Sequence, residues 1–296
     1  KEGTTGLQIY ERLGARQDIE LLRIDPDKRH DTKERRKFLN GADLVFLCLP
    51  DAAAKEAVAL IENPDVKVID ASTAHRVAPG WDYGFSELSA AHRATICRSR
   101  RVANPGCHAT GFISSVYPLV QAGLIAPDEF LTCFSLTGYS GGGKKMIAQY
   151  EGAEKPAAFA SPRIYGLNQS HKHLPEMQQV CGLTTAPAFS PIVDDYYKGM
   201  ATTIALPKAA ESVHDALAEH YKDAQLVKVH PLGWDESMVA ANTNAGLDTL
   251  TLIVNGNAER CTVTALFDNL GKGASGAAVQ NMNLMLGFEE TAGLNL

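Results

Sequence analysis

The sequence predicts an α/β protein with a doubly wound, Rossmann-type domain and a second, α+β domain with a mixed sheet. Between residues 19 and 70, apolar runs and amphipathic segments follow one another in the order strand, helix, strand, helix, strand. This order is typical of a parallel sheet that is covered by helices. Between residues 200 and 268, longer runs alternate apolar and polar residues as half-buried strands do.

The amino-acid composition indicates which classes of ligand and which cellular compartment to expect. The chain has 296 residues, of which 45% are hydrophobic and 21% charged, and a net charge of -6. This composition suits two soluble domains, and the negative charge makes nucleic acids and anionic membranes poor partners, which leaves small molecules. The six cysteines show no C-x-x-C spacing. We therefore expect no metal site and no disulfide framework, and a cytoplasmic location.

The first stretch, Gly3-Thr4-Thr5-Gly6, is followed by Ile9 at the start of a helical pattern. A glycine-rich turn that leads into a helix binds pyrophosphate through backbone N–H groups, although two glycines also occur in flexible termini. A dinucleotide-binding domain needs a strand before this turn, and the sequence begins two residues ahead of Gly3. We therefore expect that the first strand of the domain is missing from this sequence.

The next segments supply the rest of the parallel sheet. We predict strands at residues 19–24, 43–49 and 66–70, and helices at residues 31–39 and 52–61. Open α/β sheets bind ligands beyond the carboxyl ends of their strands. Ser72 and Arg76 follow the third strand. Arg76 is a candidate clamp for a phosphate or carboxylate, because a guanidinium binds both in a bidentate manner, with a solvated surface arginine as the alternative.

Residues 102–112 place Cys107 where a turn becomes a helix. Pro105 and Gly106 form the turn, and apolar residues recur at helical spacing from Ala109 onward. The free N–H groups and the dipole of a first helical turn favour an anion, so a thiol in this position ionises more easily. Most free cysteines are merely small buried residues. The Asn-Pro-Gly-Cys context favours a nucleophile instead.

Two later stretches are rich in candidate ligand-binding residues. Residues 138–145 follow a predicted strand at residues 130–137 and contain three consecutive glycines. We interpret these glycines as allowing close approach to a ligand and not as a packing feature, with an interdomain linker as the alternative. Further along, His171 and His173 precede Pro175, which favours an extended segment with both histidines on one side. A structural pair is favoured over zinc, because no other metal-binding motif accompanies them.

The rest of the second domain is predicted from alternation and helical spacing. We expect strands at residues 200–206, 247–254 and 260–268, a helix at residues 209–222, and a closing helix at residues 274–296. Small residues at the beginning of the closing helix permit close packing.

One motif resembles that of a known family. It is carried by Pro105, Gly106, Cys107, Ala109, Thr110, Gly111 and Pro118. These residues resemble the active-site motif of the N-acetyl-γ-glutamyl-phosphate reductases, enzymes of arginine biosynthesis in the semialdehyde dehydrogenase group. The commoner long form has an aromatic residue after the cysteine, whereas His108 is similar to the shorter, divergent branch. The resemblance covers nearly the whole chain.

The resemblance implies a domain plan and an activity. The dinucleotide-binding domain is expected at residues 1–107, completed by the helix at 274–296, and the catalytic and oligomerisation domain at residues 108–273. The expected activity is NADPH-dependent reductive dephosphorylation of an acyl phosphate, in a homo-oligomer that is a dimer or a tetramer. Aspartate-semialdehyde dehydrogenase or a lysine-pathway acyl-phosphate reductase would use the same chemistry. A cysteine hydrolase or acyltransferase would use Cys107 and His171 without a dinucleotide.

The resemblance also implies residue roles. Cys107 is the expected nucleophile and His171 the preferred acid/base, with His173 and Glu176 orienting it or contacting substrate; the sequence does not decide between the two histidines. Arg76 and Asn104 complete the expected substrate site. The residues expected at the dinucleotide are Gly3, Thr4, Thr5, Gly6, Asp25, Arg29, Ser72, Ser140, Gly141, Gly142 and Asn269.

Two patterns give opposite predictions for the choice of cofactor. Asp25 ends the second predicted strand, where a carboxylate binds the ribose 2′-hydroxyl of NAD. Lys28, Arg29 and His30 follow and place cations where the 2′-phosphate of NADP would lie. The resemblance also implies NADP, so we predict NADP, with NAD as the alternative.

We therefore expect Arg29→Ala to raise the KM for NADPH much more than the KM for NADH, because only NADPH carries the phosphate that the guanidinium would bind. Steady-state kinetics with each cofactor measure the two constants. Equal increases of the two KM values, or a wild-type preference for NADH, would indicate that Asp25 and not Arg29 determines the choice of cofactor.

Overall fold

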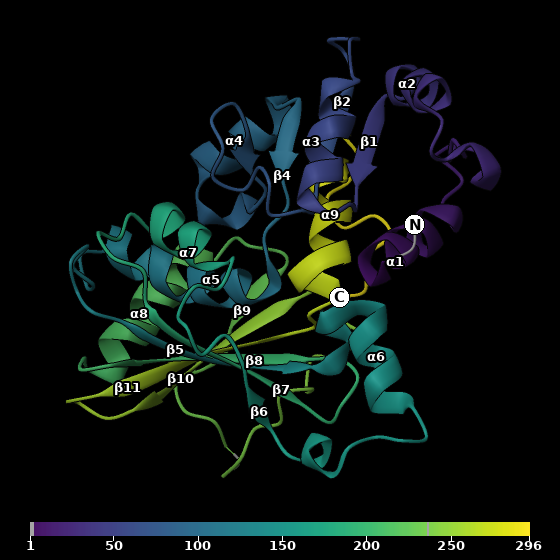
Figure 1. Ribbon diagram of the computed structural model, residues 1–296. Helices are drawn as coiled ribbons and strands as arrows, with labels where there is room; N and C mark the ends of the chain where they lie inside the picture. The colour runs from purple at the N-terminus through teal and green to yellow at the C-terminus, as the bar shows by residue number, and fades with distance from the viewer. Residues whose placement is uncertain (1–2, 236) are drawn as a thin grey trace. The chain divides into compact units, whose positions relative to one another are not determined.

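The computed structural model describes residues 3–235 and 237–296 and forms two compact units (Figure 1). Unit 1 comprises the described residues up to Pro105 together with Ala277–Leu294. Unit 2 comprises Gly106–Gly276 and Asn295–Leu296. The chain thus passes from unit 1 to unit 2 just before Cys107 and returns at the start of its last helix.

Unit 1 contains a parallel sheet with the strand order β1-β2-β4-β3. Its strands are β1 (Leu44–Leu47), β2 (Lys67–Asp70), β3 (Asp82–Tyr83) and β4 (Arg101–Ala103). The helices of this unit are α1 (Thr4–Gly14), α2 (Thr32–Gly41), α3 (Asp51–Ala59), α4 (Ala90–Arg98) and α9 (Gly276–Leu286), with short 3₁₀ turns at Pro26–Lys28 and Ser86–Leu88.

Helices cover both faces of this sheet. One buried cluster joins Leu13 of α1 and Met282 of α9 to Ile69 of β2. A second joins Ala57 of α3 to Val68 of β2, with residues of α2 packed against it. Because Ile69 and Val68 are consecutive, their side chains point to opposite faces of the strand. The doubly wound α/β class predicted from the sequence is confirmed.

Two predicted elements of unit 1 need correction. Residues 19–24 form no strand. Ile19 and Leu21 pack against the cluster of α1 and α9, so their apolar side chains are partly buried although the segment pairs with no strand. The closing helix does not extend over residues 274–296. Its first predicted residues belong to a π-helical turn at Gly271–Ser275, and α9 ends at Leu286, because Gly287 adopts φ +75° and redirects the chain.

Unit 2 contains a mixed sheet of seven strands in the order β6-β7-β5-β8-β11-β10-β9. The pairs β5–β7 and β9–β10 are parallel, and the other pairs are antiparallel. Its strands are β5 (Thr132–Gly138), β6 (Arg163–Ile164), β7 (Ala188–Asp194), β8 (Met200–Leu206), β9 (Val227–Val229), β10 (Leu250–Gly256) and β11 (Cys261–Phe267). The four strands predicted in this region correspond to β5, β8, β10 and β11.

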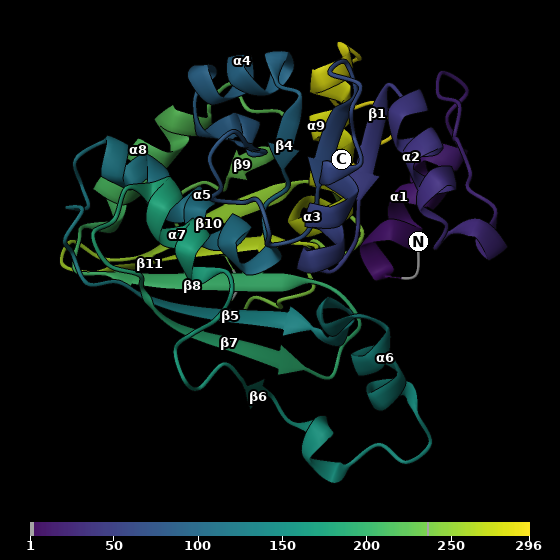
Figure 2. The same ribbon diagram turned by 45° about the horizontal axis from the view of Figure 1, so that its top comes forward.

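Helices pack on one face of the mixed sheet (Figure 2). They are α5 (Cys107–Gln121), α7 (Leu174–Cys181) and α8 (Ala210–Tyr221); α6 (Gly143–Glu151) and 3₁₀ turns at Tyr139–Gly142 and Ala157–Ala160 complete the unit. Gly111 brings α5 close to the sheet, since a Cβ atom there would overlap the side chain of Thr202 on β8. Within the described ranges, no helix combines the length and apolar character of a membrane span.

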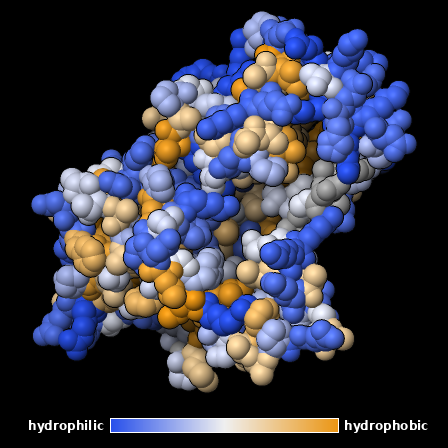
Figure 3. Space-filling model, in the orientation of Figure 1, coloured by the Kyte–Doolittle hydropathy of each residue, from blue (hydrophilic) through white to orange (hydrophobic). Residues whose placement is uncertain are grey.

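The opposite face of the mixed sheet is covered in part. Over β8, β10 and β11, a cluster of Ala201, Ile253 and Leu266 packs against Trp234. Over β5 and β6, Phe134 and Ile164 remain exposed at 49% and 56% of their surface. Figure 3 shows hydrophobic residues gathered among polar ones on the surface of these strands, low in the view.

Candidate functional site

Cys107 is the first residue of the long helix α5. Gly106 caps this helix in an extended conformation (φ -77°, ψ 146°), and the first turn contains no acidic residue. The backbone N–H groups of that turn therefore face Cys107 without a competing carboxylate from the helix itself. Gly273 keeps space beside it, because a Cβ atom there would lie 3.0 Å from the Cβ of Cys107. The surroundings thus favour a thiolate.

Glu176 fixes the backbone that leads into this helix. The Gly106 N–H donates a hydrogen bond of 3.1 Å to Oε2 of Glu176, which is 1% exposed on α7. The prediction that Pro175 imposes an extended segment is wrong. Pro175 lies in the first turn of α7, where proline is tolerated because the backbone N–H has no helical partner.

His171 and His173 lie in a turn and not in an extended segment. The His173 N–H donates to Nδ1 of His171 at 3.2 Å, and the two rings are 4.7 Å apart at 84°. Both rings lie near His108, with centroid distances of 5.8 and 5.7 Å. The turn, and not the period of a strand, therefore brings the two predicted histidines to the residue that follows Cys107.

The loop that carries these histidines is held in an uncommon conformation. Gln169 has φ 55°, and Gly166 has φ 62°. The side-chain amide of Gln169 donates to the Phe189 carbonyl and accepts from the Phe189 N–H, both at 2.8 Å. Two bonds to β7 thus offset the strain of a left-handed glutamine, which is typical of a positioned functional loop.

His108 and Tyr165 are two residues of this region to which the sequence analysis assigned no role. His108 is 2% exposed; its Nδ1 lies 2.7 Å from Oγ of Ser135, and its Nε2 lies 2.6 Å from the hydroxyl of Tyr165. Burial, reinforced by the charge of His171, lowers the pKa of His108 to about 3. A histidine directly after the nucleophilic cysteine was the one available signal.

The glycine-rich stretch joins β5 to α6 within unit 2, so it is not an interdomain linker. Ser140 is buried and accepts a hydrogen bond of 2.9 Å from Nδ2 of Asn269, whose Oδ1 accepts from the Gly199 N–H at 2.9 Å. The interpretation that packing plays no part here is wrong. A Cβ atom on Gly142 would overlap Met146, and Gly143 adopts φ 70°.

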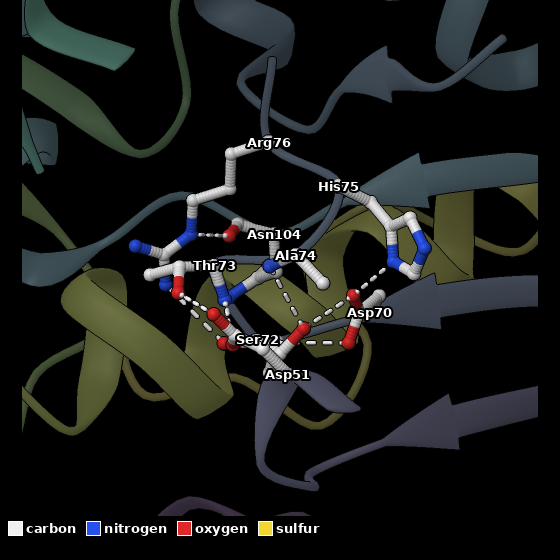
Figure 4. A network of polar contacts seen from close by, with 9 residues as sticks. Asp51, Asp70, Ser72, Thr73, Ala74, His75, Arg76 and Asn104 are labelled. Atoms are coloured by element: carbon white, nitrogen blue, oxygen red, sulfur yellow. Dashed lines mark hydrogen bonds and ion pairs between the residues drawn. The ribbon is translucent and has the colours of Figure 1, made fainter. Parts of the chain in front are cut away.

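In unit 1, a polar network organises the loop after β2 (Figure 4). The buried carboxylate of Asp70 accepts from the N–H of Ser72 at 2.9 Å and from its hydroxyl at 2.6 Å. Nδ1 of His75 lies 2.6 Å from the same carboxylate, and the His75 ring stacks on Trp81 at 4.1 Å. Ser72, predicted to contact the dinucleotide, therefore also bonds within the loop.

Arg76 follows this network directly. Its Nε donates to the Asn104 carbonyl at 3.1 Å and its Nη2 to the Ala71 carbonyl at 3.2 Å (Figure 4). Asn104 is buried, its N–H donates to the Asp70 carbonyl at 2.8 Å, and its side chain accepts from Asn281 at 3.2 Å. The guanidinium is thus tethered to two backbone carbonyls, which orient it.

The residues predicted at the dinucleotide phosphates and ribose lie at the start of unit 1. Gly3 is the N-cap of α1, whose first turn has no acidic residue; the side chain of Thr4 lies outside the described part, and Thr5 and Gly6 follow in the helix. Such a helix start suits a pyrophosphate. Asp25 accepts from the Asp27 N–H at 3.0 Å, and Arg29 is exposed with Nε 3.2 Å from Nε2 of His30.

Other cysteines differ from Cys107 in environment. Burial raises the pKa of Cys48 to about 11 and also raises the pKa values of Cys133, Cys181 and Cys261. Such thiols stay protonated and unreactive at neutral pH. Among the described residues, no group of three or more His, Cys, Asp or Glu side chains is placed to hold a metal ion.

Sequence comparison agrees with this arrangement. Residues 3–96 match the semialdehyde dehydrogenase NAD binding domain, and residues 107–269 match the semialdehyde dehydrogenase dimerisation domain. N-acetyl-gamma-glutamyl-phosphate reductase 2 of Nostoc sp. is 44% identical over 99% of this chain and 96% of its own length. The N-acetyl-gamma-glutamyl-phosphate reductase of Sinorhizobium fredii is 47% identical over 97% of this chain and 96% of its own length.

Solved structures share the fold at much lower identity. Aspartate semialdehyde dehydrogenase II from Vibrio cholerae, in complex with ASA, is 15% identical and aligns with a TM-score of 0.72 over 96% of this chain and 95% of its own. Aspartate semialdehyde dehydrogenase from Candida albicans with NADP is 13% identical, with a TM-score of 0.66 over 96% of both chains. With a helix-start cysteine, a two-histidine turn and relatives matched along nearly their whole length, the chain belongs to the N-acetyl-γ-glutamyl-phosphate reductase family of the semialdehyde dehydrogenase group.

Proposed function

We propose that this chain reduces N-acetyl-γ-glutamyl phosphate to N-acetylglutamate 5-semialdehyde in arginine biosynthesis, by way of a thioester on Cys107. The observation that carries the proposal is the position of Cys107 at the start of α5, where the N-cap Gly106 supplies no side chain to bind the first-turn N–H groups. The chain is also 44–47% identical to N-acetyl-gamma-glutamyl-phosphate reductases. The reaction needs a nucleophile that attacks an acyl carbon and then departs again. A stabilised thiolate does both.

In the first half of the reaction, the Cys107 thiolate attacks the acyl carbon, the acyl–phosphate bond breaks, and phosphate leaves. Negative charge develops on the carbonyl oxygen, and the N–H groups at the start of α5 are donors for such an oxyanion. Arg76 is the proposed clamp for an anionic group of the substrate. Its tethers to two carbonyls support this role, because they hold the guanidinium in one orientation.

In the second half, the thioester carbon accepts a hydride, and the carbon–sulfur bond breaks to give the aldehyde and the thiolate. A reduced nicotinamide dinucleotide supplies the hydride when bound. His171 is the proposed proton donor to the developing oxygen or sulfur, and His173 holds Nδ1 of His171 through its backbone N–H. The Glu176 carboxylate keeps the Cys107 backbone in place through Gly106.

We propose NADP as the preferred dinucleotide and the cytoplasm as the compartment. Asp25 uses one oxygen to cap a 3₁₀ turn, whereas Arg29 and His30 form an exposed pair, and this supports binding of a 2′-phosphate. In the other unit, Ser140, Gly141, Gly142 and Asn269 are the proposed contacts at the nicotinamide. All six cysteines lie in the described part and none of them forms a disulfide, which is usual in a reducing compartment.

The proposal is tested by oxidation of N-acetylglutamate 5-semialdehyde with each nicotinamide cofactor, with and without inorganic phosphate. We expect phosphate-dependent formation of reduced cofactor. Aspartate semialdehyde and longer lysine-pathway semialdehydes are the comparison substrates. A higher kcat/KM for one of those would reassign the substrate, and turnover without any dinucleotide would favour a hydrolase or acyltransferase.

We expect Cys107→Ser to abolish turnover and to leave the fold and the cofactor affinity nearly unchanged, because a serine hydroxyl in this position stays protonated at neutral pH. Cofactor titration and circular dichroism check the two retained properties. Cys133→Ser is the matched control, since the buried Cys133 thiol lies in β5. A near-normal rate in the Cys107 variant would disprove the covalent mechanism.

We expect His171→Ala to lower kcat by a factor on the order of a hundred or more, which is the usual size of a general acid/base contribution. His173→Ala should cost less, because its proposed part is to position His171. Steady-state kinetics of the two variants decide the order. The reverse ranking would transfer the role to His173.

We also propose that the chain forms a homodimer through the open part of the mixed sheet. The apolar side chains of Phe134 and Ile164 are exposed there, and Leu136 and Ile192 are half-buried on the same face. An exposed apolar face of a sheet is a poor surface for contact with water and suits a self-complementary interface. The match of residues 107–269 to a dimerisation domain supports a dimer formed by this unit.

Phe134→Lys is therefore expected to convert the dimer to a monomer, because it places a charge in the centre of an apolar interface. Analytical ultracentrifugation measures the change. Phe130→Lys is the matched control, since Phe130 is 72% exposed but precedes β5 and lies outside the sheet. A Phe134→Lys protein with the wild-type sedimentation coefficient would place the interface elsewhere.

A further inference from the structure

A relay of four polar groups, three of them buried, connects the middle of the mixed sheet with the first turn of α5. Oγ1 of Thr202 lies 2.8 Å from Oγ of Ser135, which lies 2.7 Å from Nδ1 of His108. Nε2 of His108 lies 2.6 Å from the hydroxyl of Tyr165. Thr202, Ser135 and His108 are at most 2% exposed. Buried polar atoms of this kind need partners, and the four groups supply them to one another.

The protonation state of His108 limits what the relay of Thr202, Ser135, His108 and Tyr165 can do. Burial lowers its pKa to about 3, so the ring is neutral near pH 7 and carries a single N–H. It therefore donates at one ring nitrogen and accepts at the other. His108 cannot serve as a charged acid or base beside Cys107, and its remaining use is to orient the groups on either side of it.

Two directions of the relay satisfy all four groups. In one, Tyr165 donates its proton to Nε2 of His108, and no donor remains for the active site. In the other, Ser135 donates to Nδ1, Nε2–H donates to the Tyr165 oxygen, and the Tyr165 O–H remains available. Burial and the charge of Cys107 raise the pKa of Tyr165, so this hydroxyl keeps its proton. The Tyr165 hydroxyl contacts His108, the residue that follows Cys107. A negative charge on Cys107 favours the second direction, because the donors then point toward that charge.

We propose that the Tyr165 hydroxyl donates a hydrogen bond to the Cys107 thiolate, and that His108 positions it through the neutral relay from Ser135 and Thr202. The inference rests on the proposed role of Cys107 as nucleophile. It assigns Tyr165 a direct part in stabilising the reactive anion, and it gives His108, which occupies the position after the nucleophile, a positioning part that requires a hydrogen-bond donor at Nε2.

The test is the pH dependence of iodoacetamide alkylation at Cys107 in the complete chain, without substrate or cofactor. Mass spectrometry of the peptide that contains Cys107 separates its modification from that of the exposed Cys97. We expect Tyr165→Phe to shift the alkylation midpoint upward by about one pH unit, the effect of losing one donor to the anion. Because no turnover is measured, this result does not depend on the identity of the substrate.

Matched variants separate the relay from general damage. Tyr221→Phe removes another buried tyrosine hydroxyl of unit 2, which donates to the Ser114 carbonyl at 2.8 Å, and should leave the midpoint unchanged. His108→Gln keeps an amide near the position of Nε2 and should retain most of the wild-type midpoint. His108→Asn places its amide near Nδ1 only, so it should shift the midpoint as Tyr165→Phe does.

Two results would overturn the inference. The first is an unchanged midpoint in folded Tyr165→Phe, with folding checked by circular dichroism. The second is an equal shift in His108→Gln and His108→Asn, which would indicate that packing at this position matters and the donor does not. If Tyr165→Phe fails to fold, the two His108 variants still decide the question.

Discussion

The proposed active site depends on where helix α5 begins. The chain leaves the parallel sheet of unit 1 at β4, turns at Pro105 and Gly106, and starts a buried helix at Cys107. Two contacts hold that start in place. Glu176 binds the Gly106 N–H from α7, and Gly111 lets the helix lie against β8 without a clash at Thr202. Because the helix cannot slide, its first-turn N–H groups and the thiol keep a fixed relation.

Neutrality of the buried His108 ring, which follows Cys107, is the second constraint. A charged His108 in this position would carry the desolvation cost of a buried cation, whereas the neutral ring links Ser135 to Tyr165 at little electrostatic cost. His171 is more exposed than His173 and lies in a turn. The proposed acid/base is thus the histidine that can exchange protons with solvent, and the relay histidine is the one that cannot.

In unit 1, the equivalent constraint is the buried carboxylate of Asp70. It collects hydrogen bonds from Ser72 and His75 and so shapes the loop that carries Arg76. A buried charge is stable only when such donors surround it. These hydrogen bonds to the Asp70 carboxylate restrict the loop after β2 and so help to position Arg76 at its end.

Local periodicity and turn residues, which act within a few positions, were sufficient to predict the α/β class, the helix start at Cys107 and the strands β5, β8, β10 and β11. They did not predict strand pairing or burial. Residues 19–24 alternate like a strand yet form no ladder, and the His171–His173 segment turns where Pro175 indicated extension. The relay of Thr202, Ser135, His108 and Tyr165 joins residues up to 94 positions apart. This relay is visible only in the folded protein, because hydrogen bonds between distant residues leave no periodic pattern in the sequence.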